Sequence, residues 1–296
     1  MLAIRTLFSS LALPLLLPAC LPDDTRAPPG QLVVTVSADP ALSDGIAATA
    51  DGWSISYRRF LVVLGDVKLD GDDCEPYTES DYSRIFELTG ASPQKVMLGY
   101  GLGSCSVGFR IASPAWDTLL GTGVSEQDDT LLRTPGSDAH ASDAGVSVHI
   151  EGTAERLGVQ KTFNWSFRRF IEYVDCTLTP SDDTENGNVR LVADKTKTID
   201  ILIRGGALFQ NPPIEPTVSP SFEAFRAADD EHGDANGEIT LEELQNSPVP
   251  LDAIPRPLIQ SLGDRVYLQL LPEIAHLGAT GVCHVRSSEK RPEFGH

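Results

Sequence analysis

The chain is short of positive charge, and its cysteines and histidines are not spaced for metal binding. Its 296 residues include 23 Lys and Arg against 42 Asp and Glu, giving a formal net charge of −19. Such acidity argues against nucleic acid or anionic lipid surfaces as partners. No Cys-x-x-Cys occurs and the 6 histidines show no ligand spacing, which disfavours a zinc site or a thioredoxin-like redox centre.

Motifs of the common enzyme classes are also missing. There is no Gly-x-Ser-x-Gly nucleophile elbow. Gly101-x-Gly103 precedes a strand pattern and does not open a helix, so it is no dinucleotide fingerprint. No nucleophile–base or paired-acid motif occurs either. We therefore expect a protein that is not an enzyme; the alternative is an enzyme whose site lies on the loops between strands and has no sequence motif.

Long apolar runs are absent beyond the N-terminus. Arg5 precedes the run Leu7–Leu17, which is too short to span a bilayer as a stable helix. No other segment is apolar enough to cross a membrane. A short apolar run behind a basic residue is typical of a signal peptide, which we place at residues 1–19.

The run ends in Leu17-Pro18-Ala19-Cys20, which resembles the lipobox of bacterial lipoproteins. The resemblance implies cleavage before Cys20 and acylation of this cysteine, with palmitate among the chains. Residues 20–30 would then form a polar, lipidated tether to the membrane. Leu21, which replaces the aspartate of the sorting signal, implies the outer membrane, facing the periplasm or the cell surface. The alternative is an ordinary signal peptide followed by an unrelated cysteine.

An even number of cysteines remains once Cys20 is set apart. Outside the cytoplasm, four cysteines predict two disulfides with three possible pairings. We expect Cys74–Cys105 and Cys176–Cys283. The second bond would fasten the C-terminal segment to the main body, and each would contribute about 2–4 kcal/mol.

Between residues 31 and 205 the apolar residues alternate with polar ones at the period of a β-strand. Along Cys105–Ile111, for example, odd positions are apolar and even positions are Ser, Gly and Arg. Many such runs with few helical patterns between them predict an antiparallel β-sandwich domain. Its core should hold the aromatic residues of these runs. The hydrophobic content of 41% suffices for one sizeable core and a smaller appendage.

The pattern changes after Gly205. Residues 211–220 are rich in proline and have the composition of a linker. Helical patterns follow on both sides of an acidic stretch and again near Leu258–Leu277, where Pro272 should kink the helix. We expect residues 206–296 to form a small C-terminal helical segment.

The residue spacing in the acidic stretch indicates a specific chemistry, the binding of a metal ion by oxygen ligands. From Asp234 to Glu243 it resembles the second half of an EF-hand calcium loop. A calcium ion takes about six to eight oxygens, so the loop must curl, and Gly237 permits the turn at positive φ. The resemblance implies the following ligands in this half, with Glu238 acting through its carbonyl: Asp234, Asn236, Glu238, Thr240 and Glu243.

The first half of the loop departs from the EF-hand pattern. Counting back from Gly237 places His232 at the first-ligand position, and imidazole is a poor calcium ligand. We expect a lengthened loop in which Asp229 or Asp230 replaces His232. The alternative is a solvated acidic turn. Seven acids lie between residues 229 and 243 and should repel one another, so metal binding should order the segment.

These features together predict a lipid-anchored extracytoplasmic binding or scaffold protein with a structural calcium site. Its partner would be the membrane through the anchor, together with a protein or glycan ligand that the sequence does not identify. The EF-hand-like loop is single, whereas sensor EF-hands work in pairs, which favours a modest-affinity structural site. The alternative is an envelope-assembly lipoprotein that binds no metal.

Overall fold

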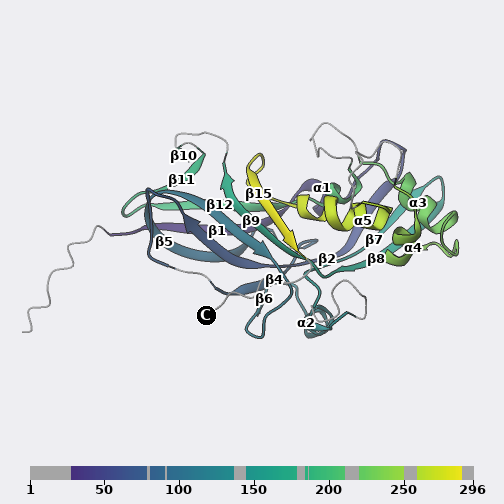
Figure 1. Cartoon of the computed structure of the whole chain (residues 1–296), viewed down its shortest axis with the longest axis horizontal. Coiled ribbons are helices and arrows are strands. Elements are labelled where there is room, and N and C mark those ends of the chain that lie inside the picture. Colours follow the sequence, from purple (N-terminus) through teal and green to yellow (C-terminus); the bar gives the residue numbers. More distant parts are fainter. Residues whose placement is uncertain are drawn as a thin grey trace, which may run out of the picture.

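The fold is known from a computed structural model. It describes residues 28–78, 81–90, 92–136, 145–178, 184–185, 187–210, 220–249 and 259–288. Within these ranges the chain is mainly β, as expected. Figure 1 shows an elongated body in which long twisted strands run through most of the length. The first described residues lie at one end, and the helices that flank the acidic loop lie at the other.

Fifteen strands occur in the described residues. Their bounds are β1 (Gly30–Ala38), β2 (Ser54–Asp70), β3 (Cys74–Pro76), β4 (Ser83–Glu87), β5 (Gln94–Ile111), β6 (Leu119–Leu120), β7 (Val148–Arg156), β8 (Val159–Phe167), β9 (Phe170–Thr177), β10 (Thr184–Glu185), β11 (Asn188–Leu191), β12 (Thr196–Ile203), β13 (Glu238–Ile239), β14 (Ala275–Leu277) and β15 (Val282–Ser288). The helices are α1 (Pro40–Ser43), α2 (Glu126–Arg133), η1 (Gly205–Phe209), α3 (Glu223–Asp230), α4 (Leu241–Asn246), α5 (Leu262–Arg265), η2 (Val266–Leu270) and η3 (Leu271–Glu273).

Hydrogen bonds join these strands into one large mixed sheet. Its main path runs β13-β8-β7-β2-β5-β1-β12-β14. The pairs β1–β12, β4–β6 and β13–β8 are parallel, so the expectation of a wholly antiparallel arrangement is wrong for them. The predicted sandwich is not confirmed. Side chains alternate in the same way in parallel and antiparallel strands, and the alternation therefore did not distinguish the two.

Strand β5 holds the sheet together along its length. Its first half pairs with β1, its middle with β11 and its last part with β9. Along the other edge β2 and β3 pair with it in succession. The bond Cys74–Cys105 links β3 to β5 beside this junction, which confirms the first predicted disulfide.

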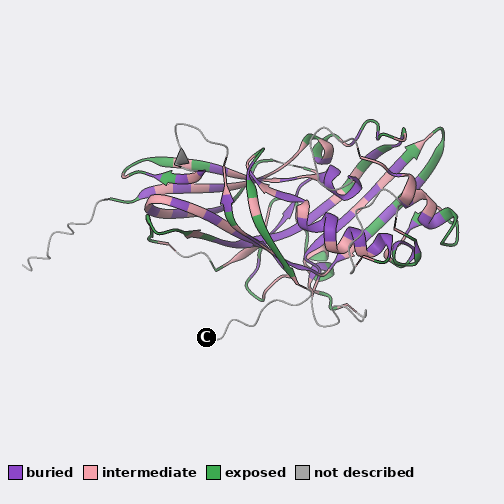
Figure 2. Cartoon of the chain, turned by 45° about the horizontal axis from the view of Figure 1, so that its top comes forward, coloured by how far each residue is buried: buried purple, intermediate pink, exposed green. Residues whose placement is uncertain are grey.

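Buried and exposed residues alternate along the strands, as Figure 2 shows by their striped colouring. The aromatic residues expected in the core, among them Phe163 and Trp165, are buried. The rings of Phe163 and Trp165 stack with centroids 4.7 Å apart, and Trp165 in turn stacks on Phe225 of α3 at 5.7 Å. Phe209 of η1 lies 5.0 Å from Phe225. Aromatic packing thus fixes α3 against β8.

The C-terminal segment is helical only in part. A continuous helical run occupies α5, η2 and η3, and Pro272, which has no amide to donate, lies just after the run changes from the π-helix η2 to the 3-10 helix η3. Beyond it, β14 pairs with β12 and β15 pairs with β9. Residues 275–288 therefore belong to the sheet, contrary to the expected helical segment. Their short alternating runs were obscured by the helical pattern just before them.

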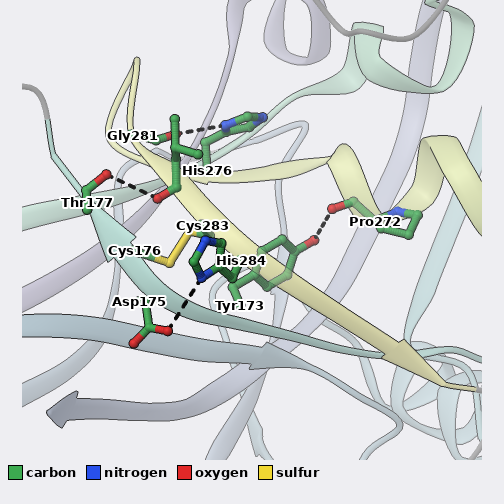
Figure 3. The surroundings of a disulfide bond; sticks show 10 residues. Tyr173, Asp175, Cys176, Thr177, Pro272, His276, Gly281, Cys283 and His284 are labelled. Carbon is green, nitrogen blue, oxygen red and sulfur yellow. Dashed lines mark hydrogen bonds and ion pairs between the residues drawn. A yellow bond between two sulfur atoms is a disulfide. The ribbon is translucent and has the colours of Figure 1, made fainter.

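The second predicted disulfide, Cys176–Cys283, is also confirmed and bonds β9 to β15. Figure 3 shows it lying between the two strands, with Tyr173 donating a hydrogen bond to the carbonyl of Pro272 at 3.0 Å. The C-terminal strand β15 is thus held to β9 by a covalent bond and by a strand ladder. No helix in the described part of the chain is long and apolar enough to cross a membrane.

Candidate cation site

The acidic loop lies between α3 and α4, and the start of α3 is held by a residue far away in sequence. The Asp51 carboxylate accepts hydrogen bonds from the hydroxyl of Ser221 at 2.7 Å and from the backbone amides of Phe222 and Glu223 at 2.8 and 2.6 Å. These amides at the start of α3 have no partner within the helix. Burial raises the pKa of Asp51, but hydrogen bonds from Thr49, Ser221 and the two amides outweigh it and lower the pKa overall.

Helical periodicity places Asp229 inside the protein. It follows the buried Phe225 by one turn of α3, and its side chain is 0% exposed. One carboxylate oxygen, Oδ2, accepts a hydrogen bond from the amide of Gly237 at 3.0 Å, on the far side of the loop. Gly237 has a φ of 91°, as expected for the turn. The loop therefore closes on Asp229.

The end of the loop is organised by a capping box at the start of α4. The Thr240 hydroxyl accepts a hydrogen bond from the amide of Glu243 at 3.2 Å, and Oε2 of Glu243 accepts one from the amide of Thr240 at 2.8 Å. The other oxygen, Oε1, accepts from the amide of Asp234 at 3.2 Å. A Cβ on Gly233 would lie 2.0 Å from this Oε1, so any other residue there would displace the Glu243 carboxylate. The buried Glu243 carboxylate is thus fixed in place.

The centre of the loop is fastened to the sheet. Strand β13 pairs in parallel with β8, which brings Ile239 beside Phe163. The amide of Thr162 donates to the carbonyl of Gly237 at 2.8 Å, and Trp165 Nε1 donates to the carbonyl of Ile239 at 2.8 Å. A strand of the main sheet therefore supports this single loop.

Three carboxylates of the loop converge. Asp229, Asp234 and Glu243 each offer one oxygen, and these oxygens lie within 4.8 Å of one another. Asp229 and Glu243 are buried, whereas Asp234 is exposed and leaves the group open to water on one side. Such a group of carboxylate oxygens can hold a metal ion. Of the two aspartates considered for the first position, Asp229 belongs to the group; Asp230 and His232 do not.

The other predicted ligands are used differently. Asn236 donates from Nδ2 to Asp234 at 2.9 Å and accepts at Oδ1 from the amide of Glu238 at 2.6 Å. The Thr240 hydroxyl is engaged with Glu243 in the capping box. The structure therefore brings together Asp229, Asp234 and Glu243, and it places Asn236, Glu238 and Thr240 around them as supports of the loop.

A lysine that the sequence analysis did not consider lies beside the group. Lys161 of β8 is 4% exposed and donates to both Asp229 Oδ2 and Asp230 Oδ1. Burial lowers the pKa of Lys161, but the hydrogen bonds from this ammonium to Asp229 and Asp230 outweigh it and raise the pKa overall. The sequence did contain a signal. Lys161 shares the inward face of β8 with Phe163 and Trp165, where a lysine needs an acidic partner.

A second cation neutralises the start of the loop. The Arg226 guanidinium pairs with Asp230 at 2.6 Å and with Glu231 at 2.8 Å. The hydrogen bond from Lys161 lowers the pKa of Asp230, burial opposes it, and Arg226 adds to the lowering. The chain therefore supplies two positive charges to the first acids of the loop.

One oxygen of the Asp229 carboxylate has no hydrogen-bond partner. Asp229 Oδ1 is buried and accepts no hydrogen bond in the structure. An unpaired carboxylate oxygen away from water is costly. Since Oδ2 is taken by Lys161 and Gly237, Oδ1 is the oxygen of this side chain that a cation can take.

A serine–histidine–glutamate chain also occurs on β7 and β8. His149 Nδ1 lies 2.9 Å from Ser166 Oγ, and Nε2 lies 3.1 Å from Glu151 Oε1. The residue order resembles a hydrolytic triad. However, the His149 ring is 2% exposed and both nitrogens are engaged, so the imidazole is enclosed between neighbouring side chains. The geometry fits a structural hydrogen-bond chain.

The comparisons with known proteins returned no relative. No protein-family model matches the chain, and no curated protein and no solved structure is significantly similar to it. Function is therefore inferred from the geometry of the acidic group and from the compartment that the disulfides favour.

Proposed function

We propose that the protein is a lipid-anchored, extracytoplasmic binding or scaffold protein stabilised by a calcium ion in the loop of residues 229–243. The observation that carries the proposal is the convergence of the Asp229, Asp234 and Glu243 carboxylates, with Asp229 Oδ1 buried and unpaired. The loop is an EF-hand-like loop lengthened in its first half, with Asp229 in place of His232 as first ligand.

The donor set favours calcium among common metals. The converging side-chain atoms are all carboxylate oxygens, the ligands preferred by hard cations, whereas zinc and copper favour nitrogen and sulfur. Asp234 is exposed, so water can complete a coordination shell of about six to eight oxygens. Extracellular calcium modules bind with Kd values of about 10⁻⁴–10⁻³ M, which suits a site this open.

A cation here would be structural because of what the loop connects. Asp229 is on α3, Glu243 is on α4, and the residues between them are bonded to β8. An ion shared by both carboxylates ties two helices to the edge of the sheet. At about ten times Kd, binding stabilises the folded state by about 1.4 kcal/mol.

Thermal unfolding tests the calcium site. The EDTA-treated protein should gain about 3–6 °C in Tm when about 10 mM calcium is added. Asp234→Asn should abolish the gain at little cost to folding, because Asp234 is exposed. Glu242→Gln is the matched control, since Glu242 is an exposed acid next to Glu243, and it should keep the gain. A wild-type Tm indifferent to calcium would refute the site.

The anchor and the compartment are supported by different features. Cys20 lies outside the described residues, so the support is the lipobox-like sequence. The two disulfides favour an oxidising compartment. With the residue after Cys20, this points to the bacterial outer membrane, facing the periplasm or the surface. The partner there would be a protein or a glycan.

Membrane fractionation tests the anchor. In a bacterial host that processes lipoproteins, the wild type should be found in the membrane fraction and Cys20→Ala in the soluble fraction, since the acyl chains are attached to this residue. Equal membrane association of both forms would show that the lipobox interpretation is wrong.

One observation favours the metal-free alternative, an envelope-assembly lipoprotein. Lys161 and Arg226 already neutralise several acids of the loop. If these two side chains supply all the positive charge that the loop needs, calcium titration of the wild type will produce no binding heat.

A further inference from the structure

The acids of the loop have two kinds of partner, positively charged side chains at one place and hydrogen-bond donors of the loop itself at another. Its first acids, Asp230 and Glu231, are paired with Lys161 and Arg226. The carboxylates of Asp234 and Glu243 instead interact with amides and side chains of the loop itself. Asp229 lies between these two parts and belongs to both.

The two oxygens of Asp229 face different environments. Oδ2 accepts a hydrogen bond from the ammonium of Lys161, whereas Oδ1 is buried and accepts no hydrogen bond; one of the two oxygens lies within 4.8 Å of carboxylate oxygens of Asp234 and Glu243. A divalent ion on Oδ1 and the ammonium on Oδ2 would therefore share one carboxylate. Two positive charges a few ångströms apart repel each other, and more strongly inside a protein than in water.

Lys161 is poorly placed to move away from a bound ion. It is 4% exposed and lies on the buried face of β8, in line with Phe163 and Trp165. An ammonium removed from its partners but kept from water is costly. Its second partner, Asp230, can hold it when a cation draws on Asp229.

We propose that Lys161 is a tethered counter-cation that keeps the acidic loop folded when no metal is bound and that lowers the affinity of the loop for divalent cations. The inference rests on the proposed calcium site and adds its regulation. Lys161 and the metal compete for the charge of Asp229. The loop consequently has a weak affinity that matches a calcium-rich exterior, and it stays assembled when calcium is scarce.

Calcium titration by calorimetry on the EDTA-treated full chain tests the competition. Lys161→Met keeps the long apolar stem and removes the charge, so its calcium affinity should rise about tenfold while its Tm without calcium falls. Lys161→Arg keeps the charge and should bind calcium as the wild type does. Lys95→Met, on an exposed strand position, is the control for losing a lysine and should change neither quantity.

Asp230→Asn provides a second test, in which calcium affinity should change in the opposite direction. This variant keeps the buried lysine. Lys161 would then depend on Asp229 alone, so calcium affinity should fall several-fold. Asp230 is partly exposed, which makes this variant tolerable to the fold if Lys161→Met does not fold.

The outcomes separate this inference from the proposed function. Tighter calcium binding by Lys161→Met together with weaker binding by Asp230→Asn supports the inference. Equal affinity of wild type, Lys161→Met and Asp230→Asn overturns it but leaves the calcium site in place. Absence of binding in every form refutes the calcium site and the inference with it. Binding by Lys161→Met alone supports the competition and shows that Lys161 replaces the metal in the native chain.

Discussion

At the scale of single residues, the buried ionisable side chains are enclosed by partners from several elements. His149 on β7 is held by Ser166 of β8 and by Glu151, and Arg59 and Asp128 contribute charge nearby. Burial, the largest effect, lowers its pKa below 6.5, and the hydrogen bond with Glu151 only partly offsets this. Burial in the folded state therefore disfavours the charged form of His149.

His149 should therefore make the stability of the fold depend on pH in the mildly acidic range. The unfolded chain takes up the proton near pH 6.5, whereas the folded chain takes it up only at lower pH. Stability should be complete above pH 6.5 and should fall as the pH drops from 6.5 through the folded pKa of His149. Melting curves between pH 7.5 and 5.5 should show a smaller decline in Tm for His149→Gln than for the wild type. An identical decline in both would contradict this assignment.

The candidate site shows what residue patterns predict and what they miss. Spacing predicted Asp234 and Glu243, because the second half of the loop follows the EF-hand order. It narrowed the first ligand to Asp229 or Asp230 without choosing, since an inserted stretch can curl in more than one way. The structure brings Asp229, and not Asp230, into the group of three carboxylates, because Asp229 follows the buried Phe225 by one helical turn. Lys161 was missed because its partners are 68 and 69 residues away.

At the scale of elements, α3 depends on a side chain from another part of the fold. Its N-cap residue, Phe222, makes no side-chain cap hydrogen bond, and Asp51 from the segment before β2 accepts the free amides. The same helix carries Asp229 and Arg226, so its position sets the geometry of the acidic loop.

Removal of this remote cap should therefore weaken the fold measurably. Asp51→Ala should lower the free energy of unfolding by about 2 kcal/mol, because amides at the helix start lose a charged acceptor. Urea denaturation gives the value. Asp72→Ala, at an exposed turn position, should change it by less than about 0.5 kcal/mol. Equal losses of unfolding free energy in the two variants would show that Asp51 does not stabilise the start of α3.

The positions of the strands were predicted better than the pairing between strands. The alternating runs indicated most strands correctly, because one face of each is buried in the core. The parallel pairing of β1 with β12 was not predictable, since it depends on which distant strands meet. Strands β14 and β15 were missed because they are short and follow a helical run, and β15 has mostly exposed side chains on both faces.

At the scale of the whole molecule, two disulfides hold the sheet. Cys74–Cys105 closes a sequence separation of 31 residues, whereas Cys176–Cys283 closes 107. Chain entropy makes the longer closure more stabilising, at about 4.8 against about 3.7 kcal/mol. The number of disulfides was predictable from the cysteine count and the expected compartment, whereas the count left three pairings open; the observed pairs join neighbouring strands, β3 to β5 and β9 to β15.

Removal of each disulfide in turn should show that the longer closure contributes more to stability. The double variant Cys176→Ser/Cys283→Ser should lose about 4–5 kcal/mol of unfolding free energy, and Cys74→Ser/Cys105→Ser about 3–4 kcal/mol. Guanidinium denaturation of both variants beside the wild type measures the difference. A larger loss from the shorter bridge would mean that local packing around Cys105 outweighs chain entropy.

The bond between Cys176 and Cys283 also makes a closed ring of the intervening chain. The ring contains α3, the acidic loop and α4. A protease that cuts one peptide bond within it releases nothing, because the two pieces remain joined through sulfur. If the chain is anchored at Cys20 as proposed, shedding of the C-terminal part by a cut within the ring would also need a reductant. A nicked molecule would therefore keep its full mass on a non-reducing gel and separate into two bands only after reduction.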